Sequence, residues 1–313
     1  MTLHHLEFRA MGCKMLAVLD SSDPRAVEQL DQVLAWFSTW EQCLSRFRAD
    51  SELVQLNARA GQTVQVSEVL WQVIQVARWA AQHSDGLVTP TLLGELEAAG
   101  YVQSFEEHES WPEERPSADR VAQQSLPQSW RAIRVDPRRR TICVPPGMRL
   151  DLGGVAKGWA VATAARRLSA YGPVLIDAGG DIAMSGPQAD GSPWPIGVAN
   201  PADPDTQLEL LLIERGGIAT SGRDYRRWQQ NGAVRHHIID PRTGRPAETD
   251  VLSATIIAPN IEDAEVAAKT ALILGSRAGL AWIEARPSLA GLLVLEHGDI
   301  VQSRHLKRYL WTQ

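Results

Sequence analysis

The sequence predicts an α+β protein in which a mostly antiparallel sheet packs with helices. Two observations carry this prediction. Stretches of β character separated by turn residues follow one another late in the chain, as is typical of antiparallel strands; they are 194–198, 208–213, 217–221 and 251–257. Segments with apolar residues at helical spacing lie on both sides of them, at about 24–44, 67–84 and 261–274.

The first third of the chain alternates strand and helix patterns. Residues 6–19 read as one or two strands that turn near Met11-Gly12, and Pro24 opens a helix that runs to about Leu44. Ser51 and Ser67 each stand where an N-cap is preferred, so they predict a short helix ending near residue 57 and a longer one ending before residue 85. An extended piece is expected at 87–92.

The middle and the end of the chain complete the element list. The polar section from about residue 95 to 130, with its Glu-Glu and Pro runs, is expected to be a surface insertion. Further elements are expected from apolar patterning and turn residues: a hairpin of 133–135 with 141–144, a helix at 159–168, strands at 174–176 and 182–184, a helix at 279–284, and a closing hairpin of 291–296 with 300–303.

Composition limits the functional classes. The 313 residues suit one large domain or two, and a net charge of −6 without a basic block argues against nucleic acid as a partner. The three cysteines match neither a disulfide framework nor metal-ligand spacing. Because no export signal and no run of ~18 apolar residues is seen, a cytoplasmic protein without a transmembrane segment is expected.

The segment 151–158 (DLGGVAKG) is the strongest chemical pattern. Glycines let the backbone approach oxygen atoms closely, and Lys157 adds a positive charge where the next helix begins. This arrangement suits a phosphate group, although Gly-Gly helix entries are also common as tight turns. It matches neither the Walker pattern nor G-x-G-x-x-G.

A second Gly-Gly-acid cluster, 177–181 (DAGGD), follows a buried strand. Asp181 at this turn can accept hydrogen bonds from a ribose or an adenine amine, or it can bond to its own turn backbone. A third pattern is 236–244 (HHIIDPRTG). In a strand, His237 and Ile239 would share one face, with His236 and Ile238 on the other. His237 would suit a general base that deprotonates a hydroxyl near neutral pH.

Six motifs follow one another along the chain in the same order as in a known family. The similarity to that family extends from about Phe8 to Gln302. The six motifs are Met11-Gly12, 44–57 (LSxFxxxSELxxxN), 151–158, 177–181, Thr220-Ser221-Gly222 and 237–244 (HIIDPxTG). Together they resemble the ApbE family of FAD:protein FMN transferases. The resemblance implies a single ApbE-like, T-fold-related domain over 1–313. It also implies cleavage of FAD, release of AMP and attachment of FMN to a Thr or Ser hydroxyl of an acceptor flavoprotein, at sequences of the Asp-Gly-x-Thr type, with Mg²⁺.

The resemblance also assigns residues to the flavin and the nucleotide. Met11 and Phe47 would pack against the flavin ring, where the family usually has tyrosine at the second position. Leu87, Val88 and Thr89 match a Gly-x-Phe-Asp stretch that lines the nucleotide, and Thr89 replaces the usual Asp.

The remaining site residues follow from the same resemblance. Asp151 and Lys157 would contact FAD, while Gly153 and Gly154 would bring backbone to the diphosphate or its metal. Gly180 and Asp181 would lie near the adenosine part of FAD. His237, with Ile238, would lie near the reacting phosphate, and His237 and Lys157 are the expected catalytic residues.

The late helix departs from the family pattern Ala-Asp-Ala-x-x-Thr-Ala, whose Asp and Thr help to bind magnesium. Counted back from Gly275, these positions hold Glu265 and Lys269. Glu265 can still ligate a hard cation, whereas a lysine repels one. Three interpretations stay open: a metal site with altered ligands, a site where Lys269 replaces the metal, and an ordinary i, i+4 surface pair. These changes, with Thr89, leave two alternatives to transfer: binding of FAD without transfer, and hydrolysis of FAD to FMN and AMP.

Overall fold

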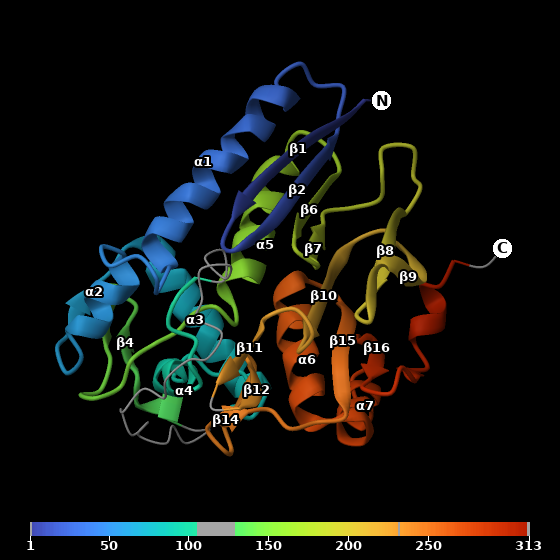
Figure 1. Ribbon diagram of the computed structural model, residues 1–313. Helices are drawn as coiled ribbons and strands as arrows, with labels where there is room; N and C mark the ends of the chain where they lie inside the picture. Colours follow the sequence, from blue (N-terminus) through green and yellow to red (C-terminus); the bar gives the residue numbers. More distant parts are fainter. Residues whose placement is uncertain (1, 105–128, 231, 312–313) are drawn as a thin grey trace. The chain divides into compact units, whose positions relative to one another are not determined.

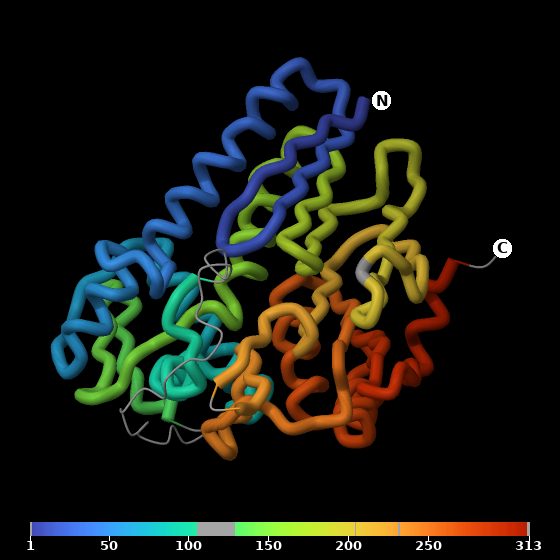
Figure 2. Tube along the Cα trace, in the orientation of Figure 1, coloured from blue at the N-terminus to red at the C-terminus, as the bar shows by residue number. Residues whose placement is uncertain are grey.

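The computed structural model describes residues 2–104, 129–230 and 232–311, and the chain divides into two compact units. Unit 1 comprises Met1–Phe37, Lys157–Tyr225 and Thr249–Gln313, and unit 2 comprises Ser38–Ala156 and Arg226–Glu248. Figures 1 and 2 colour the chain by residue number, so the segments of each unit can be followed along it.

Unit 1 is built on an eight-stranded sheet in the order β1-β2-β6-β7-β10-β15-β16-β17, and every neighbouring pair is antiparallel. The strands are β1 (Leu3–Ala10), β2 (Cys13–Asp20), β6 (Val174–Ala178), β7 (Asp181–Met184), β10 (Gly216–Gly222), β15 (Val251–Ala258), β16 (Ala290–Leu295) and β17 (Ile300–Gln302). The predicted α+β class and the mostly antiparallel sheet are confirmed.

A separate hairpin of β8 (Trp194–Asn200) and β9 (Asp203–Ile213) contributes to the core of unit 1. In β8, the buried residues Trp194, Ile196 and Val198 alternate with exposed ones, as expected for a strand with one face against the core. They form one apolar cluster with residues of the large sheet, including Ile218 and Ile257. Burial of this cluster is the main apolar contribution that holds the sheet to the hairpin.

Three helices belong mainly to unit 1: α5 (Ala156–Leu168), α6 (Ile261–Leu274) and α7 (Ser276–Glu284). Asn260 caps α6 by accepting a hydrogen bond from the backbone N–H of Asp263 at 2.8 Å. The helix α6 packs against β10 and β15, and α7 packs against β16 (Figure 1). The close approach depends on Gly217, where a Cβ would lie 2.3 Å from the backbone of Ile261.

The β1–β2 hairpin turns through Met11 and Gly12, and Ala10 pairs with Cys13. Both turn residues have positive φ, 50° at Met11 and 73° at Gly12, as in the type I′ turns that match strand twist. Type I′ turns favour Asn-Gly, because asparagine tolerates the left-handed conformation and methionine does not. Met11 therefore holds a strained position at one of the predicted flavin contacts.

Replacing Met11 by asparagine is expected to raise the free energy of unfolding by about 1 kcal/mol, since the left-handed conformation costs about this much for methionine and asparagine adopts it more readily. Urea unfolding of Met11→Asn measures the change, and Met11→Leu is the matched control because it keeps the penalty. Equal unfolding midpoints for the two variants would show that the turn stores no strain.

Unit 2 contains the helices α2 (Glu52–Ala58), α3 (Glu68–His83) and α4 (Leu93–Ala98), with a short 3-10 helix η2 (Ser129–Ala132). Its strands are β3 (Val64–Gln65), β4 (Arg134–Asp136), β5 (Thr141–Cys143), β11 (Arg227–Gln230), β12 (Ala233–His236), β13 (Ile239–Asp240) and β14 (Arg245–Pro246). Ser51 and Ser67 cap α2 and α3, as predicted. The helix α1 (Ala26–Leu44) contains residues of both units.

Two predicted features of unit 2 are wrong. Residues 87–92 form bends and a turn instead of an extended strand, because the hydroxyl of Ser84 accepts the N–H of Val88 at 2.9 Å and folds the chain back. The polar insertion was expected from residue 95, yet α4 runs through Ala98, and Leu96 and Tyr101 are buried. The rest of that insertion, 105–128, lies outside the described residues.

In the described part of the chain, no helix is both long enough and apolar enough to cross a membrane.

Candidate functional site

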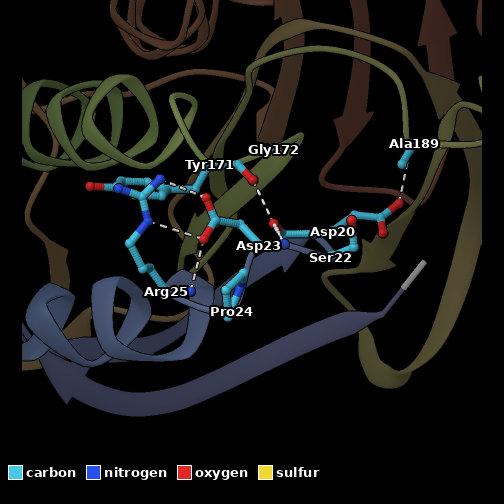
Figure 3. Close-up of a pocket in the computed structure, with 9 residues that line it drawn as sticks. Asp20, Ser22, Asp23, Pro24, Arg25, Tyr171, Gly172 and Ala189 are labelled. Atoms are coloured by element: carbon cyan, nitrogen blue, oxygen red, sulfur yellow. Dashed lines mark hydrogen bonds and ion pairs between the residues drawn. The ribbon is translucent and has the colours of Figure 1, made fainter.

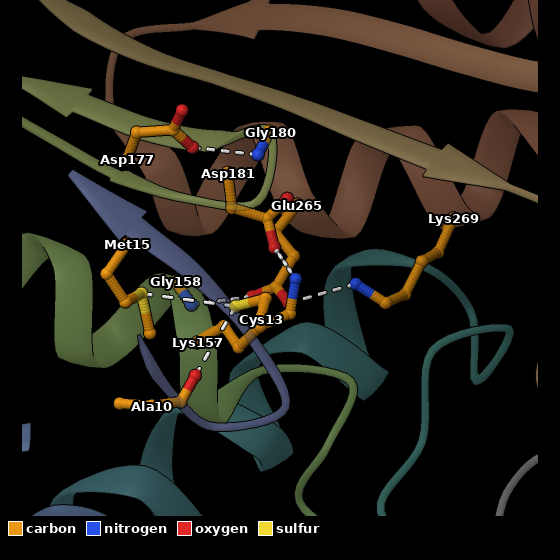
Figure 4. Close-up of polar contacts among 10 residues, drawn as sticks. All are labelled: Ala10, Cys13, Met15, Lys157, Gly158, Asp177, Gly180, Asp181, Glu265 and Lys269. Carbon is orange, nitrogen blue, oxygen red and sulfur yellow. Dashed lines mark hydrogen bonds and ion pairs between the residues drawn. The ribbon is translucent and has the colours of Figure 1, made fainter. Parts of the chain in front are cut away.

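The first candidate cluster lies in unit 1 where α5 begins (Figure 4). Lys157 stands in the first turn of α5, and its ammonium donates to the carboxylate of Asp181, the first residue of β7. The Asp181 side chain is only 3% exposed, whereas Lys157 retains 19%. The helix start therefore carries a partly accessible cation whose position is fixed by a buried carboxylate.

A second pair of opposite charges belongs to the same unit. On α6, the Lys269 ammonium donates to Oε1 of Glu265 at 3.0 Å, while the backbone N–H of Gly158 donates to Oε2 at 3.2 Å. Glu265 is 1% exposed and Lys269 18%. A Cβ at Gly158 would lie 2.5 Å from Oε2, so glycine is what lets this carboxylate approach the N-terminus of α5. Burial raises the pKa of Glu265, and the Lys269 ammonium opposes that shift.

We define the charge cluster as Lys157, Asp181, Glu265 and Lys269. Of the three open interpretations, an ordinary surface i, i+4 pair does not describe Glu265 and Lys269, because the Glu265 carboxylate is buried while Lys269 keeps 18% of its side chain exposed. Since the four side chains carry two ammonium groups and two carboxylates, the cluster is close to neutral when all four are ionised.

The turn 177–181 is stabilised by its own glycines and by a hydrogen bond to Asp177. Gly179 and Gly180 have φ of 65° and 94°, which favours glycine at both positions, and the N–H of Gly180 donates to Oδ1 of Asp177 at 2.8 Å. Burial is the largest cause of the raised pKa of Asp177. Asp177 therefore bonds to the turn backbone, which leaves the Asp181 carboxylate to position Lys157. The contact of Gly180 and Asp181 with adenosine stays a prediction.

The second candidate cluster lies in unit 2 and is centred on Arg46. Its Nε lies 3.0 Å from Oδ2 of Asp151, and its Nη2 donates to the carbonyl oxygen of Tyr101 at 2.7 Å. The guanidinium carbon is 4.1 Å from the ring centroid of Phe47 and 4.5 Å from that of Tyr101, within cation–π range. The Arg46 side chain is 6% exposed. Asp151, predicted to contact FAD, holds this arginine.

Aromatic rings extend this second cluster. Tyr101 stacks on Trp228 with ring centroids 5.4 Å apart, and Phe47 meets Tyr101 edge to face at 5.5 Å. Trp228 is fixed in turn by its indole N–H, which donates to the carbonyl oxygen of Ala99 at 2.8 Å. Phe47 is 37% exposed, whereas Tyr101 and Trp228 are buried, so the Phe47 ring is the exposed part of this group and the other two rings support it from inside unit 2. We call Arg46, Phe47, Tyr101, Asp151 and Trp228 the aromatic cluster.

The two adjacent histidines have different environments. The ring of His236 is buried, with Nε2 3.1 Å from the carbonyl oxygen of Ala247 and Nδ1 accepting the N–H of Ile238 at 3.3 Å. His237 stands at a bend between β12 and β13, with its ring centroid 6.4 Å from that of Tyr101. The expected alternation along one strand is wrong because the strand breaks at His237, and both Ile238 and Ile239 are buried. His236 is structural and His237 borders the aromatic cluster.

The other predicted site residues are distributed over the two units. Unit 1 holds Met11, Lys157, Gly180, Asp181 and Glu265, and unit 2 holds Phe47, Leu87, Val88, Thr89, Asp151, Gly153, Gly154, His237 and Ile238. Leu87 and Val88 are buried, and the hydroxyl of Thr89 lies 3.0 Å from that of Thr91. Gly153 donates its N–H to Oδ1 of Asp151 at 3.0 Å. Their contacts with FAD stay predictions.

Three residues of the aromatic cluster were missed in the sequence. Arg46 occupies an unspecified position of the motif 44–57, Tyr101 lies in the section predicted to be a polar insertion, and Trp228 belongs to none of the six motifs. A signal for Tyr101 was available, since Leu92 and Leu96 have the i, i+4 spacing of a helix leading to it.

Magnesium is the metal that the family resemblance implies, and the described residues do not fit it. Both oxygens of Glu265 already accept hydrogen bonds, one from an ammonium group. Within residues 2–104, 129–230 and 232–311, no group of three or more His, Cys, Asp and Glu side chains that could hold a metal ion is found.

A cavity of about 600 Å³ lies elsewhere in unit 1, at the end of β2 and the start of α1 (Figure 3). Arg25 and Asp23 form a bidentate pair there, with N–O distances of 3.1 and 2.8 Å. The hydrogen bonds from Arg25 lower the pKa of Asp23 to about 2. None of the predicted site residues lines this cavity, so it has no part in the proposed chemistry.

The chain resembles known proteins along almost its whole length. It is 30% identical over 298 residues to an FAD:protein FMN transferase of Klebsiella pneumoniae, with 94% of this chain and 89% of the relative covered. The crystal structure of the ApbE protein from Thermotoga maritima superposes with a TM-score of 0.86 at 27% identity, covering 99% of this chain and all of that one. The apo flavinyl transferase ApbE of Pseudomonas stutzeri shares the fold, with a TM-score of 0.81 over 100% and 98% of the two chains at 22% identity.

The antiparallel sheet, with a lysine–carboxylate cluster at a glycine-containing helix start, defines an α+β protein of the flavin transferase fold. The model of the ApbE family matches residues 11–293. The chain belongs to the ApbE family.

Proposed function

We propose that the chain is an FAD:protein FMN transferase, which moves FMN from FAD to a threonine or serine hydroxyl of an acceptor flavoprotein and releases AMP. The observation that carries the proposal is the charge cluster. It fixes Lys157 at the N-terminus of α5, and an ammonium group beside backbone N–H groups suits a diphosphate. The relatives named for this activity cover the chain almost from end to end.

The transfer is a substitution at phosphorus. The acceptor oxygen forms a bond to the phosphorus of the FMN half, and the bond from that phosphorus to the bridging oxygen breaks. AMP leaves with the bridging oxygen and its electron pair. The hydroxyl proton passes to the ring of His237, which suits a general base near neutral pH.

The chain's own cations neutralise the charge that develops on the leaving oxygen. Preorganised positive groups are the main means by which proteins promote phosphoryl transfer, because they lose no orientation energy during the step. Lys157 is held by Asp181 and Lys269 by Glu265. An ammonium carries three N–H donors, so it can bind a carboxylate and a phosphate oxygen together.

Within unit 2, the aromatic cluster contains Phe47, which the family resemblance predicts to pack against the flavin ring. Phe47 presents a ring edge-on to Tyr101, and the stack continues through Trp228. A planar isoalloxazine would gain apolar burial and ring contact on the exposed Phe47 ring, which the buried Tyr101 and Trp228 hold in place. Arg46 and Asp151 keep this surface rigid, because the guanidinium is bonded on one side and covered by two rings.

The experiment is incubation of the purified chain with FAD, with and without a peptide that carries an Asp-Gly-x-Thr sequence. Transfer predicts AMP release only with the peptide, together with a peptide mass increase that equals FMN minus water. AMP and free FMN without peptide would instead indicate a pyrophosphatase. FAD that stays bound and intact in every condition would indicate a protein that binds FAD without transferring it.

A further inference from the structure

In the charge cluster, the Lys269 ammonium contacts Glu265, the carboxylate that the family resemblance assigns to magnesium binding. Glu265 has no oxygen without a donor, since Lys269 contacts Oε1 and Gly158 contacts Oε2. With the side chain 1% exposed, water does not replace these contacts readily. The carboxylate is therefore committed to residues of the protein itself.

A divalent cation at Glu265 would meet a fixed positive charge. Magnesium requires near-octahedral oxygen ligands, and it usually keeps several waters. The Lys269 ammonium is 3.0 Å from Oε1 of a carboxylate that is 1% exposed, and the Lys269 side chain itself is 18% exposed, so water would screen the repulsion between the two cations only in part. Lys157 adds a second ammonium to the same cluster, where it pairs with Asp181. Figure 4 shows the two lysines reaching the two carboxylates from α5 and α6.

We infer that Lys269 takes the place of the divalent cation, so that this chain handles the diphosphate of its substrate without magnesium. Glu265 is a positioning residue in this arrangement, because it holds the Lys269 ammonium one helical turn away along α6. Gly158 completes the arrangement by admitting the carboxylate to the start of α5. The inference rests on the proposed function for its catalytic part, while its metal-binding part can be tested in the protein alone.

The first test uses Mn²⁺ as a paramagnetic substitute for magnesium. The electron paramagnetic resonance signal of free Mn²⁺ falls when a protein binds the ion. We expect the purified wild-type chain to leave this signal unchanged up to millimolar Mn²⁺. The variant Lys269→Thr, which puts a hydroxyl in place of the ammonium, is expected to reduce it. Binding of one Mn²⁺ per wild-type chain would overturn the inference.

The second test measures AMP release from FAD with acceptor peptide, in EDTA and in excess Mg²⁺. The rate of AMP release by the wild type is expected to differ by less than twofold between the two conditions. Lys269→Arg is expected to behave in the same way because it keeps the positive charge. AMP release by Lys269→Thr is expected to be at least tenfold faster in excess Mg²⁺ than in EDTA. A wild type that loses tenfold or more of its turnover in EDTA and regains it with Mg²⁺ contradicts the inference.

The two tests separate the inference from the proposed function. If no variant releases AMP in any condition, transfer and hydrolysis both fail, and the Mn²⁺ measurement still decides whether the cluster excludes a divalent cation. If Lys269→Thr does not fold, the wild-type results in EDTA and in Mn²⁺ decide alone.

Discussion

Replacing His237 by alanine is expected to slow AMP release by at least about 100-fold, the usual contribution of a general base. FAD binding is expected to persist, because neither the aromatic cluster nor the charge cluster contains a histidine. Quenching of flavin fluorescence measures binding, and nucleotide analysis measures turnover. Unchanged turnover would exclude His237 as the base.

His236 provides the matched control for this experiment. Its ring is buried and bonded to the backbone on both nitrogens, so His236→Ala removes two hydrogen bonds and leaves a cavity. We expect His236→Ala to lower the melting temperature, and His237→Ala to leave it nearly unchanged. A reversed pattern would mean that the structural and chemical roles of the two histidines are exchanged.

Replacing Lys269 by methionine is expected to lower the free energy of unfolding by about 3–5 kcal/mol, because removal of one partner of a buried ion pair leaves the other charge uncompensated. Glu265 is 1% exposed and would keep only the N–H of Gly158 as a donor. Urea unfolding measures the loss. The double variant Glu265→Gln with Lys269→Met is expected to regain most of it, since no unpaired charge remains at these two positions.

An exposed ion pair serves as the control for this stability change. Arg140 and Glu68 lie 2.6 Å apart with side chains 46% and 57% exposed. Water solvates both groups when they separate, so Arg140→Met is expected to change the unfolding midpoint little. A similar loss for Arg140→Met and Lys269→Met would show that burial does not govern the effect.

Elements with a strong periodic pattern could be predicted from the sequence. The helices α1, α3 and α6, the caps Ser51 and Ser67, and the β1–β2 turn follow from local residue choice and are confirmed. Segment 87–92 could not be predicted, because its conformation depends on a hydroxyl at the end of α3, which competes with an extended backbone. The run of apolar residues there is compatible with either outcome.

The sequence motifs indicate the candidate residues one by one, but they do not indicate which residues these contact. Lys157 and Asp181 each stood out in a glycine-containing motif, yet their pairing depends on where α5 and β7 lie in the sheet unit. Gly158 and Glu265 are 107 residues apart in the chain. Arg46 lies outside the recognisable motif letters, and its role is set by Asp151 and two rings. Such contacts depend on tertiary structure, which spacing does not encode.

The division of the chain into interleaved segments has a consequence for the order in which it folds during synthesis. Unit 2 has all its residues once residue 248 is made, whereas unit 1 needs the strands β15, β16 and β17, which end at Gln302. The pairing of β2 with β6 already spans more than 150 residues, for example Met15 with Ala178. Because distant pairings form slowly, we expect the N-terminal hairpin of β1 and β2 to remain without its partner strand β6 until well over half of the chain has been synthesised. The half of the chain that holds Lys157 and Lys269 is therefore expected to be completed last.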